Sequence, residues 1–284
     1  MLGASGGLQY NKFASEKDTT DYTSLTGESQ FIVPYTNDAP FNDNFTVSFW
    51  FKTNDGRQSG IAGPNRYFFS VSGGNGTTDA SALWVGINPV GKLYLAYLSR
   101  YDFFNPNEPD AGIVLGLTDD ALADGAVDWT HIAVTVTGGN GSDTVFAAYI
   151  NGSAVSGITL SYNACPSAKH DNFQNGSGIA IGGLMGDAFT PLDPISGTGI
   201  HTTEFIDDFA LHSAALDADA VAAVYNSGTP INLLANSGNY DNSGDVVLYY
   251  KFNGKFDGDA LLDSHGTQNA TANTGTQFST ESAT

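Results

Sequence analysis

The sequence has one cysteine, few basic residues and no long apolar run. Because Cys165 is alone, an intrachain disulfide is excluded and the fold must rely on its hydrophobic core. No apolar stretch approaches the ~20 residues of a membrane helix, so we expect no membrane insertion. Ten basic against 30 acidic residues give a formal net charge of −20. This charge repels phosphate backbones, and we therefore expect no nucleic-acid partner.

The N-terminus lacks a basic segment followed by an apolar stretch, so we expect no signal peptide and synthesis in the cytoplasm. Residues 1–25 are polar and rich in glycine and serine. We predict that they form an arm that becomes ordered only against another surface. Residues 26–284 are predicted to form a single domain, because no internal linker separates two parts of this range.

Alternating apolar and polar residues predict strands through most of the chain. In FTVSFWFKT (45–53), one face carries Phe45, Val47, Phe49 and Phe51, and the other includes Trp50, which is open to a partner contact. Similar patterns predict further strands at 29–35, 66–72, 82–89, 92–99, 112–117, 129–137, 144–152, 179–184, 205–212 and 245–253. Short strands at close intervals indicate an all-β fold, an antiparallel β-sandwich of the jelly-roll type.

One short surface helix and one tight hairpin stand out from this pattern. DADAVAAVYNSG (217–228) has an N-cap candidate in Asp217 and an end signal in Gly228. The dipeptide Asn151-Gly152 lies between two strand patterns and predicts a two-residue hairpin turn.

The order of these segments resembles the laminin-G-like, or concanavalin A-like lectin and glucanase, superfamily. The matching stretches are SLTGESQFIVPY, FTVSFWFKT, WTHIAVTV, AAYINGSAV, IAIGG and FIDDFALHSAALDADAVAAVYNSG. They run in family order over about residues 24–255. The resemblance implies a concanavalin A-like sandwich.

The C-terminal part is similar to a subset of this superfamily found in structural proteins of marine bacteriophages. The stretches that carry this similarity are YNSGTPINLL, NYDNSGDVVLYYKFNG and DSHGTQNATANTG. It implies a virion component, a capsid decoration or a tail or fibre protein, that is assembled in the host cytoplasm. It also implies contacts with other virion proteins through the N-terminal arm, and self-association into a homo-oligomer.

The sequence disfavours catalysis because it lacks the paired carboxylates of a glycosidase. Glycosidases of this fold place paired Glu and Asp residues on one strand, but the chain has only five Glu, and no two lie close in sequence. Asp207 and Asp208 adjoin one another, and regular alternation along a strand would point them to opposite faces. We therefore expect no enzyme activity.

The same Asp pair suggests a metal site. One of the two must face inward or toward a covered edge, and a buried carboxylate is costly unless it is paired or bound to a metal. In glucanases of the superfamily this position binds a structural calcium ion, which implies Asp207 as a ligand, with Gly27 and Glu28 in the N-terminal ligand region. The alternative is that Asp207 caps a turn and Asp208 faces water.

A long stretch without periodicity, residues 100–111, offers Tyr101, Phe103, Phe104 and Asn105. Aromatic rings of this kind can stack on sugar rings, and Asn can bond their hydroxyl groups. The alternative is that these residues pin the loop to the sandwich or to a neighbouring subunit.

Two classes of function therefore fit the sequence. One is a structural virion protein that uses the sandwich as a scaffold, and the other is a lectin module that attaches to host-surface polysaccharide. A glycoside hydrolase is the least favoured third class, because the paired carboxylates are absent.

Overall fold

The computed structural model describes part of the chain in detail. The described residues are 9–10, 31–34, 44–53, 66–73, 80–87, 93–101, 113–116, 127–137, 145–155, 159–161, 178–181, 204–252, 256–257, 260–266, 268–272 and 278–279. Among the residues singled out in the sequence, Gly27, Glu28, Phe103, Phe104 and Asn105 lie outside these ranges.

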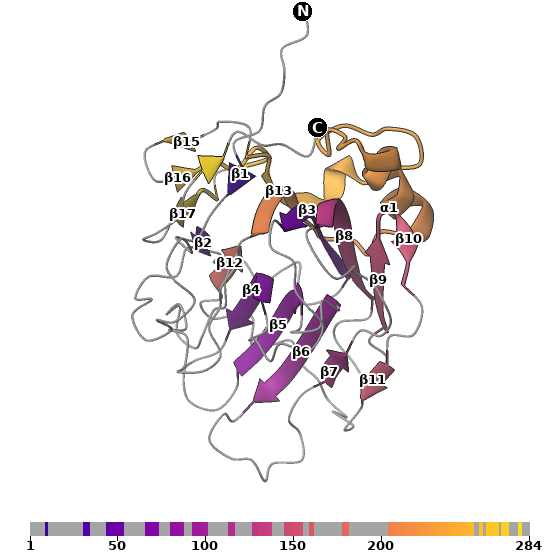
Figure 1. Cartoon of the computed structure of the whole chain (residues 1–284), viewed down its shortest axis with the longest axis vertical. Helices are drawn as coiled ribbons and strands as arrows, with labels where there is room; N and C mark the ends of the chain where they lie inside the picture. The colour runs from indigo at the N-terminus through magenta and orange to yellow at the C-terminus, as the bar shows by residue number, and fades with distance from the viewer. Residues whose placement is uncertain are drawn as a thin grey trace, which may run out of the picture.

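Two antiparallel sheets make up the described fold (Figure 1). The eight-stranded sheet contains β1 (Gln9–Tyr10), β3 (Phe45–Thr53), β8 (Val127–Thr137), β9 (Val145–Ile150), β10 (Ser153–Ala154), β13 (Glu204–His212), β14 (Val246–Tyr250) and β18 (Phe278–Ser279). The ten-stranded sheet contains β2 (Phe31–Pro34), β4 (Arg66–Gly73), β5 (Ala80–Ile87), β6 (Leu93–Tyr101), β7 (Ile113–Gly116), β11 (Thr159–Ser161), β12 (Gly178–Ile181), β15 (Phe256–Asp257), β16 (Ala260–Leu261) and β17 (Ala270–Ala272). The predicted antiparallel β-sandwich is confirmed.

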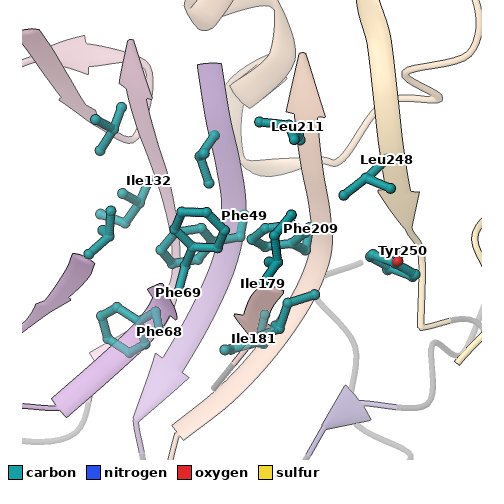
Figure 2. Packing of buried hydrophobic residues seen from close by; sticks show 14 of the residues in the cluster. Phe49, Phe68, Phe69, Ile132, Ile179, Ile181, Phe209, Leu211, Leu248 and Tyr250 are labelled. Carbon is teal, nitrogen blue, oxygen red and sulfur yellow. The ribbon is translucent and has the colours of Figure 1, made fainter. Parts of the chain in front are cut away.

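The main core lies between the two sheets and is rich in aromatic side chains (Figure 2). Phe49 of β3 packs on Phe68 of β4 with ring centroids 5.5 Å apart, and Phe69 of β4 packs on Phe209 of β13 at 5.4 Å. The predicted inner face of β3 is confirmed, since all four of its apolar residues are buried in this core. Such burial stabilises by roughly 1.5–3 kcal/mol for each large apolar side chain, so this layer holds the two sheets together without disulfides.

A second apolar cluster closes the other face of the eight-stranded sheet. Helix α1 (Ala218–Tyr225) and the chain on either side of it cover this face. The cluster comprises Ala133, Tyr149, Ala210, Leu216, Ala220, Val221, Val224, Leu233, Tyr240, Val246 and Tyr249. We call it the helix-side cluster.

The expectation that Trp50 is open to a partner is wrong. Trp50 is only 2% exposed, because its ring stacks on Tyr225 of α1 with centroids 5.7 Å apart. His131 of β8 lies 5.2 Å from the same indole. Alternation places Trp50 on the polar side of β3, but the helix covers that side and turns it into a second buried layer.

The capping of α1 agrees with the sequence signals. Asp217 is the N-cap, and its carboxylate accepts a 2.8 Å hydrogen bond from the amide of Ala220. The helix ends at Tyr225, three residues before the predicted Gly228, because Asn226 adopts the left-handed conformation at the C-cap with φ of 44°. Asparagine tolerates this conformation. A 3₁₀ turn, Asn226–Gly228, follows.

The predicted hairpin turn is confirmed and also supports the helix. Asn151 and Gly152 connect β9 to β10 with φ of 49° and 73°, as a type I′ turn requires. A Cβ atom on Gly152 would lie 2.9 Å from Cδ1 of Tyr225. Glycine is therefore needed here both for the backbone conformation and for the close approach of α1.

The chain after β14 is tied to the sheet by Asp263. Its carboxylate accepts hydrogen bonds of 3.0 Å from the backbone amides of Tyr249, His265 and Gly266. The amide of Asp263 in turn donates to Oδ1 of Asn269. The Asp-Ser-x-Gly stretch of the tail thus forms a turn that anchors the C-terminal strands.

The N-terminal strand β1 lies within the predicted arm. Tyr10 pairs with Ile206 of β13 on one side and with Phe278 of β18 on the other. β14 pairs with β13 farther along the same edge, between Phe209 and His212. The boundary of the arm at residue 25 stays a prediction, since residues 11–30 lie outside the described ranges.

Candidate functional site

A β-bulge interrupts β13 at the two adjacent aspartates. Asp207 pairs with Trp50 of β3, and the next register pair joins Ala210 to Ser48. Asp208 and Phe209 therefore stand opposite a single residue of β3. Asp208 adopts a positive φ of 47° at this point, and the strand then resumes its alternation shifted by one residue.

The bulge places both carboxylates on the helix side of the sheet. Asp207 stands directly opposite Trp50, whose ring lies under α1. The carboxylate of Asp208 reaches Tyr249, a member of the helix-side cluster. The prediction that the two side chains point to opposite faces is therefore wrong, because it assumed an unbroken strand.

Both aspartates take part in hydrogen bonds within the protein. Asp207 is only 1% exposed, and its Oδ1 accepts a 3.0 Å bond from the backbone amide of Asp208. Asp208 is partly buried, and its Oδ1 accepts a 2.6 Å bond from the phenolic hydroxyl of Tyr249. The alternative to calcium binding is that Asp207 caps a turn and Asp208 faces water. Its first part agrees with the bond that Asp207 accepts from a backbone amide. Its second part does not agree, because Asp208 bonds Tyr249.

Burial dominates the electrostatics of this site. It raises the pKa of Asp208 to about 6, although the hydrogen bond from Tyr249 and the charge of Lys251 both act to lower it. Burial, followed by the negative charge of Asp208, raises the pKa of Tyr249 far above its usual value. Tyr249 is thus a neutral hydrogen-bond donor at every physiological pH.

Lys251 lies on the solvent side of the pair. Its ammonium group is 5.0 Å from the ring centroid of Tyr249 and donates a 2.8 Å bond to Oδ1 of Asn232. Local sequence patterns did not identify Tyr249 and Lys251 as neighbours of Asp208, since they follow it by 41 and 43 residues. A signal for the bulge was present: the core residues Ile206 and Phe209 are three positions apart, where regular alternation gives two.

The predicted calcium site is only partly described. Asp207 is buried as that hypothesis requires, but Gly27 and Glu28 lie outside the described ranges. Within the described part of the chain, no three His, Cys, Asp or Glu residues are grouped to hold a metal ion. Calcium binding therefore stays a prediction.

Of the four predicted glycan-contact residues, only Tyr101 lies within the described part of the chain. Tyr101 is the last residue of β6, and the backbone register pairs it with Ala80 of β5. Phe103, Phe104 and Asn105 lie beyond the described part of this loop.

Two other polar features have structural roles. His131 is buried, and burial lowers its pKa to about 3, so it stays neutral and packs under α1. DNSGD (241–245) forms a turn in which the amide of Asn242 donates a 2.8 Å bond to the carboxylate of Asp245.

No helix among the described residues has the length and apolar character that crossing a bilayer requires. Comparisons of the chain with protein-family models and with curated protein sequences found no match.

Comparison with solved structures found lectin-like folds. A Bacteroides ovatus protein proposed to bind carbohydrate matches 90% of this chain with a TM-score of 0.50 and 15% identity. This chain spans 59% of the length of that protein. The heptameric SAP-like pentraxin of Limulus polyphemus matches 79% of this chain and 84% of its own, with a TM-score of 0.47 and 15% identity. The CBM40 domain of the Ruminococcus gnavus IT-sialidase matches 70% of this chain and 94% of its own, with a TM-score of 0.40 and 11% identity. At these identities the likeness concerns the fold alone, and the fold that the Bacteroides protein shares with this chain is a lectin-like β-sandwich.

Proposed function

We propose that this chain is a non-catalytic, lectin-like module that binds carbohydrate. The carbohydrate ligand is supported by the fold that the chain shares with the Bacteroides ovatus protein, and the lack of catalysis by the way three of the described carboxylates are used. The Asp207 carboxylate bonds a backbone amide, Asp208 bonds Tyr249, and Asp263 bonds three backbone amides. Cleavage of a glycosidic bond needs two carboxyl groups that flank the substrate, and these three are committed to holding the fold.

The arrangement of the sheets bears on where a ligand could bind. The helix-side cluster covers β8, β9, β13 and β14 on the helix-side face of the eight-stranded sheet, so these strands offer no platform there in the described part of the chain. We propose that the loop after β6, with Tyr101, Phe103, Phe104 and Asn105, contacts the glycan. The aromatic residues would stack on sugar rings, and Asn105 would bond their hydroxyl groups.

A glycan array followed by isothermal titration calorimetry tests this proposal. We expect wild-type protein to bind at least one polysaccharide, and Phe103→Ala with Phe104→Ala to weaken binding by at least about tenfold, as the loss of one or two stacking contacts would. Val145→Thr serves as the control, since Val145 is exposed and belongs to β9 of the other sheet. Incubation with the bound polysaccharide should release no new reducing ends. Absence of binding to every glycan, or release of reducing ends, would contradict the proposal.

A structural role in a virion is a second candidate. The observation that bears on it is that β1, which lies inside residues 1–25, occupies the eight-stranded sheet between β13 and the edge strand β18. The same place between the two strands could be taken by the N-terminal segment of a neighbouring subunit, because identical subunits can exchange a terminal strand. In this role the chain would self-associate and contact other virion proteins through residues 1–25.

Truncation separates the two candidates. If the arm mediates assembly, deletion of residues 1–25 should abolish incorporation into particles and reduce the oligomer seen by light scattering, while glycan binding is retained. A shorter deletion of residues 1–8 leaves β1 intact and serves as the control. Normal incorporation of the longer deletion would argue against an assembly role.

A structural calcium ion is proposed as part of the same module, with Asp207 as a ligand and Gly27 and Glu28 as further ligands. The burial of Asp207 supports this, because a buried carboxylate gains most from a bound cation.

A further inference from the structure

A polar groove runs along the outer side of α1. One wall is a helical stripe of the residues Asp219, Ala222, Ala223 and Asn226, which recur at the spacing that brings side chains onto one face. The other wall is the turn formed by Ser237, Gly238 and Asn239. The groove encloses about 400 Å³ and opens to solvent. This volume lies within the range of small-ligand sites.

Both walls are held in place by the interior of the protein. Val221 and Val224, on the opposite side of α1, are buried in the helix-side cluster. The turn is closed by two backbone hydrogen bonds between Ser237 and Tyr240, of 2.8 and 3.0 Å. The groove therefore exists before any ligand arrives, which lowers the entropy cost of binding.

Tyr240 anchors the turn to the interior of the protein. Its side chain is fully buried, and its hydroxyl donates a 2.8 Å bond to the carbonyl of Leu233. The single hydroxyl proton is thus used, so Nε2 of His212, 3.0 Å away, is the donor to the same oxygen. Burial lowers the pKa of His212 to about 4, which keeps this imidazole neutral.

The lining of the groove selects the chemistry of a ligand. It offers one carboxylate, two amides and one hydroxyl, with small apolar patches from two alanines and no lysine or arginine. Asn226 donates one of its two Nδ2 hydrogens to the carbonyl of Thr229, which leaves the second hydrogen and its Oδ1 for a ligand. The lining thus offers both donors and acceptors, with Asp219 as its one charged group, so a ligand with several hydroxyl groups and without negative charge fits best. A net charge of −20 further disfavours anions.

We infer that this groove binds a neutral saccharide unit, as a second glycan site on the helix side of the molecule. This inference rests on the proposed carbohydrate-binding function and adds a location and a ligand class to it. A cation site is a poorer fit, because Asp219 is the only carboxylate in the lining and calcium takes six to eight oxygen ligands. Figure 1 shows that α1 lies far along the long axis from the end of β6, after which the residues of the first proposed glycan site begin.

The test is titration of the ¹⁵N-labelled full-length chain with neutral oligosaccharides from laminarin, agarose and mannan. An acidic oligosaccharide from alginate and a poly-arginine peptide are the comparison ligands. We expect a neutral oligosaccharide to shift the amide signals of Ser237, Gly238 and Asn239, with the alginate and peptide ligands causing no change there. Signals that move only with poly-arginine would overturn the inference in favour of a basic protein partner.

Two groove variants and one matched control complete the design. Asp219→Ala removes an acceptor, and Asn239→Trp fills the groove from an exposed turn position. Each should weaken neutral-saccharide binding about tenfold or more, as the loss of one or two hydrogen bonds would. Asp241→Ala makes the same charge change at an exposed residue outside the lining and should bind as wild type does.

The outcomes distinguish this inference from the proposed function. If wild type binds neutral saccharides and both groove variants retain full affinity while the Phe103 and Phe104 variants lose it, the groove is not a site and the proposed function stands. If wild type binds no saccharide at all, both proposals are wrong. Unchanged melting temperatures of the variants would confirm that any loss is not due to unfolding.

Discussion

The hydroxyl of Tyr249 donates a 2.6 Å hydrogen bond to the carboxylate of Asp208. This bond connects the bulge of β13 to β14 and sits beside a second, fully buried carboxylate, that of Asp207. The pair makes the bulge sensitive to pH, because burial raises the pKa of Asp208 to about 6 from its ordinary value of 3.8.

The first prediction concerns this pH dependence. A carboxyl group whose pKa is higher in the folded state binds its proton more tightly there, so its contribution to stability is present below pH 4 and is lost as the pH rises to 6. Relative to Asp208→Asn, wild type should lose about 1–2 kcal/mol of unfolding free energy over this range, allowing for partial exposure. Urea unfolding at several pH values measures the difference, and a constant difference would contradict it.

A buried histidine, His212, changes the stability of the protein with pH in the opposite direction. Burial lowers the pKa of His212 to about 4, so its contribution to stability is present above pH 6.5 and is lost as the pH falls towards 4. His212→Gln keeps a donor for the hydroxyl of Tyr240 but does not titrate. We expect a flatter dependence of melting temperature on pH in this variant than in wild type, and an identical dependence would exclude His212 as the cause.

Gly152 should be among the least replaceable residues described. Gly152→Ala adds strain at a φ of 73° and a Cβ 2.9 Å from Tyr225, so we expect a loss of more than about 2 kcal/mol. Gly238→Ala has a similar φ of 60° but meets nothing within 4 Å, and should cost only about 1 kcal/mol. The difference between the two variants isolates the contact with α1. Equal losses in chemical unfolding would show that α1 tolerates the added atom.

Asp263 should contribute strongly to stability without any role in binding. Asp263→Ala leaves the amides of Tyr249, His265 and Gly266 without their acceptor, and we expect a loss of at least about 3 kcal/mol. Asp241→Ala, at an exposed position, should stay within about 0.5 kcal/mol of wild type. A small effect of Asp263→Ala in urea unfolding would indicate that water replaces the carboxylate.

Calcium should stabilise the protein if Asp207 is a ligand. With calcium at about 100 times its dissociation constant, the unfolding free energy should rise by about 2.7 kcal/mol over that in EDTA. Asp207→Asn should abolish this difference, whereas Asp241→Asn should retain it. Identical melting curves of wild type with calcium and with EDTA would refute the proposed site.

Much of the fold could be predicted because strands that face one core alternate regularly. The inner face of β3, the hairpin at Asn151-Gly152 and the N-cap at Asp217 each depend on residues within a few positions, so local sequence is sufficient to predict them. The exception was β13, where a bulge moved both aspartates to one face. The three-residue spacing of the core residues Ile206 and Phe209 signals an irregularity, but the pairing of Asp207 with Trp50 and of Asp208 with Tyr249 depends on β3 and β14, which are distant in sequence.

The sequence by itself determined the class of the protein: an acidic, disulfide-free, antiparallel sandwich with one capped helix in its described part. Only the tertiary structure decided which polar residues are buried and which line a surface. Trp50 and His131 lie on the polar side of their strands, yet α1 covers them. Asp219 and Asn239, 20 residues apart, meet across a groove because the turn before Tyr240 folds back on the helix. Contacts between distant segments depend on packing, and packing is a property of the whole chain.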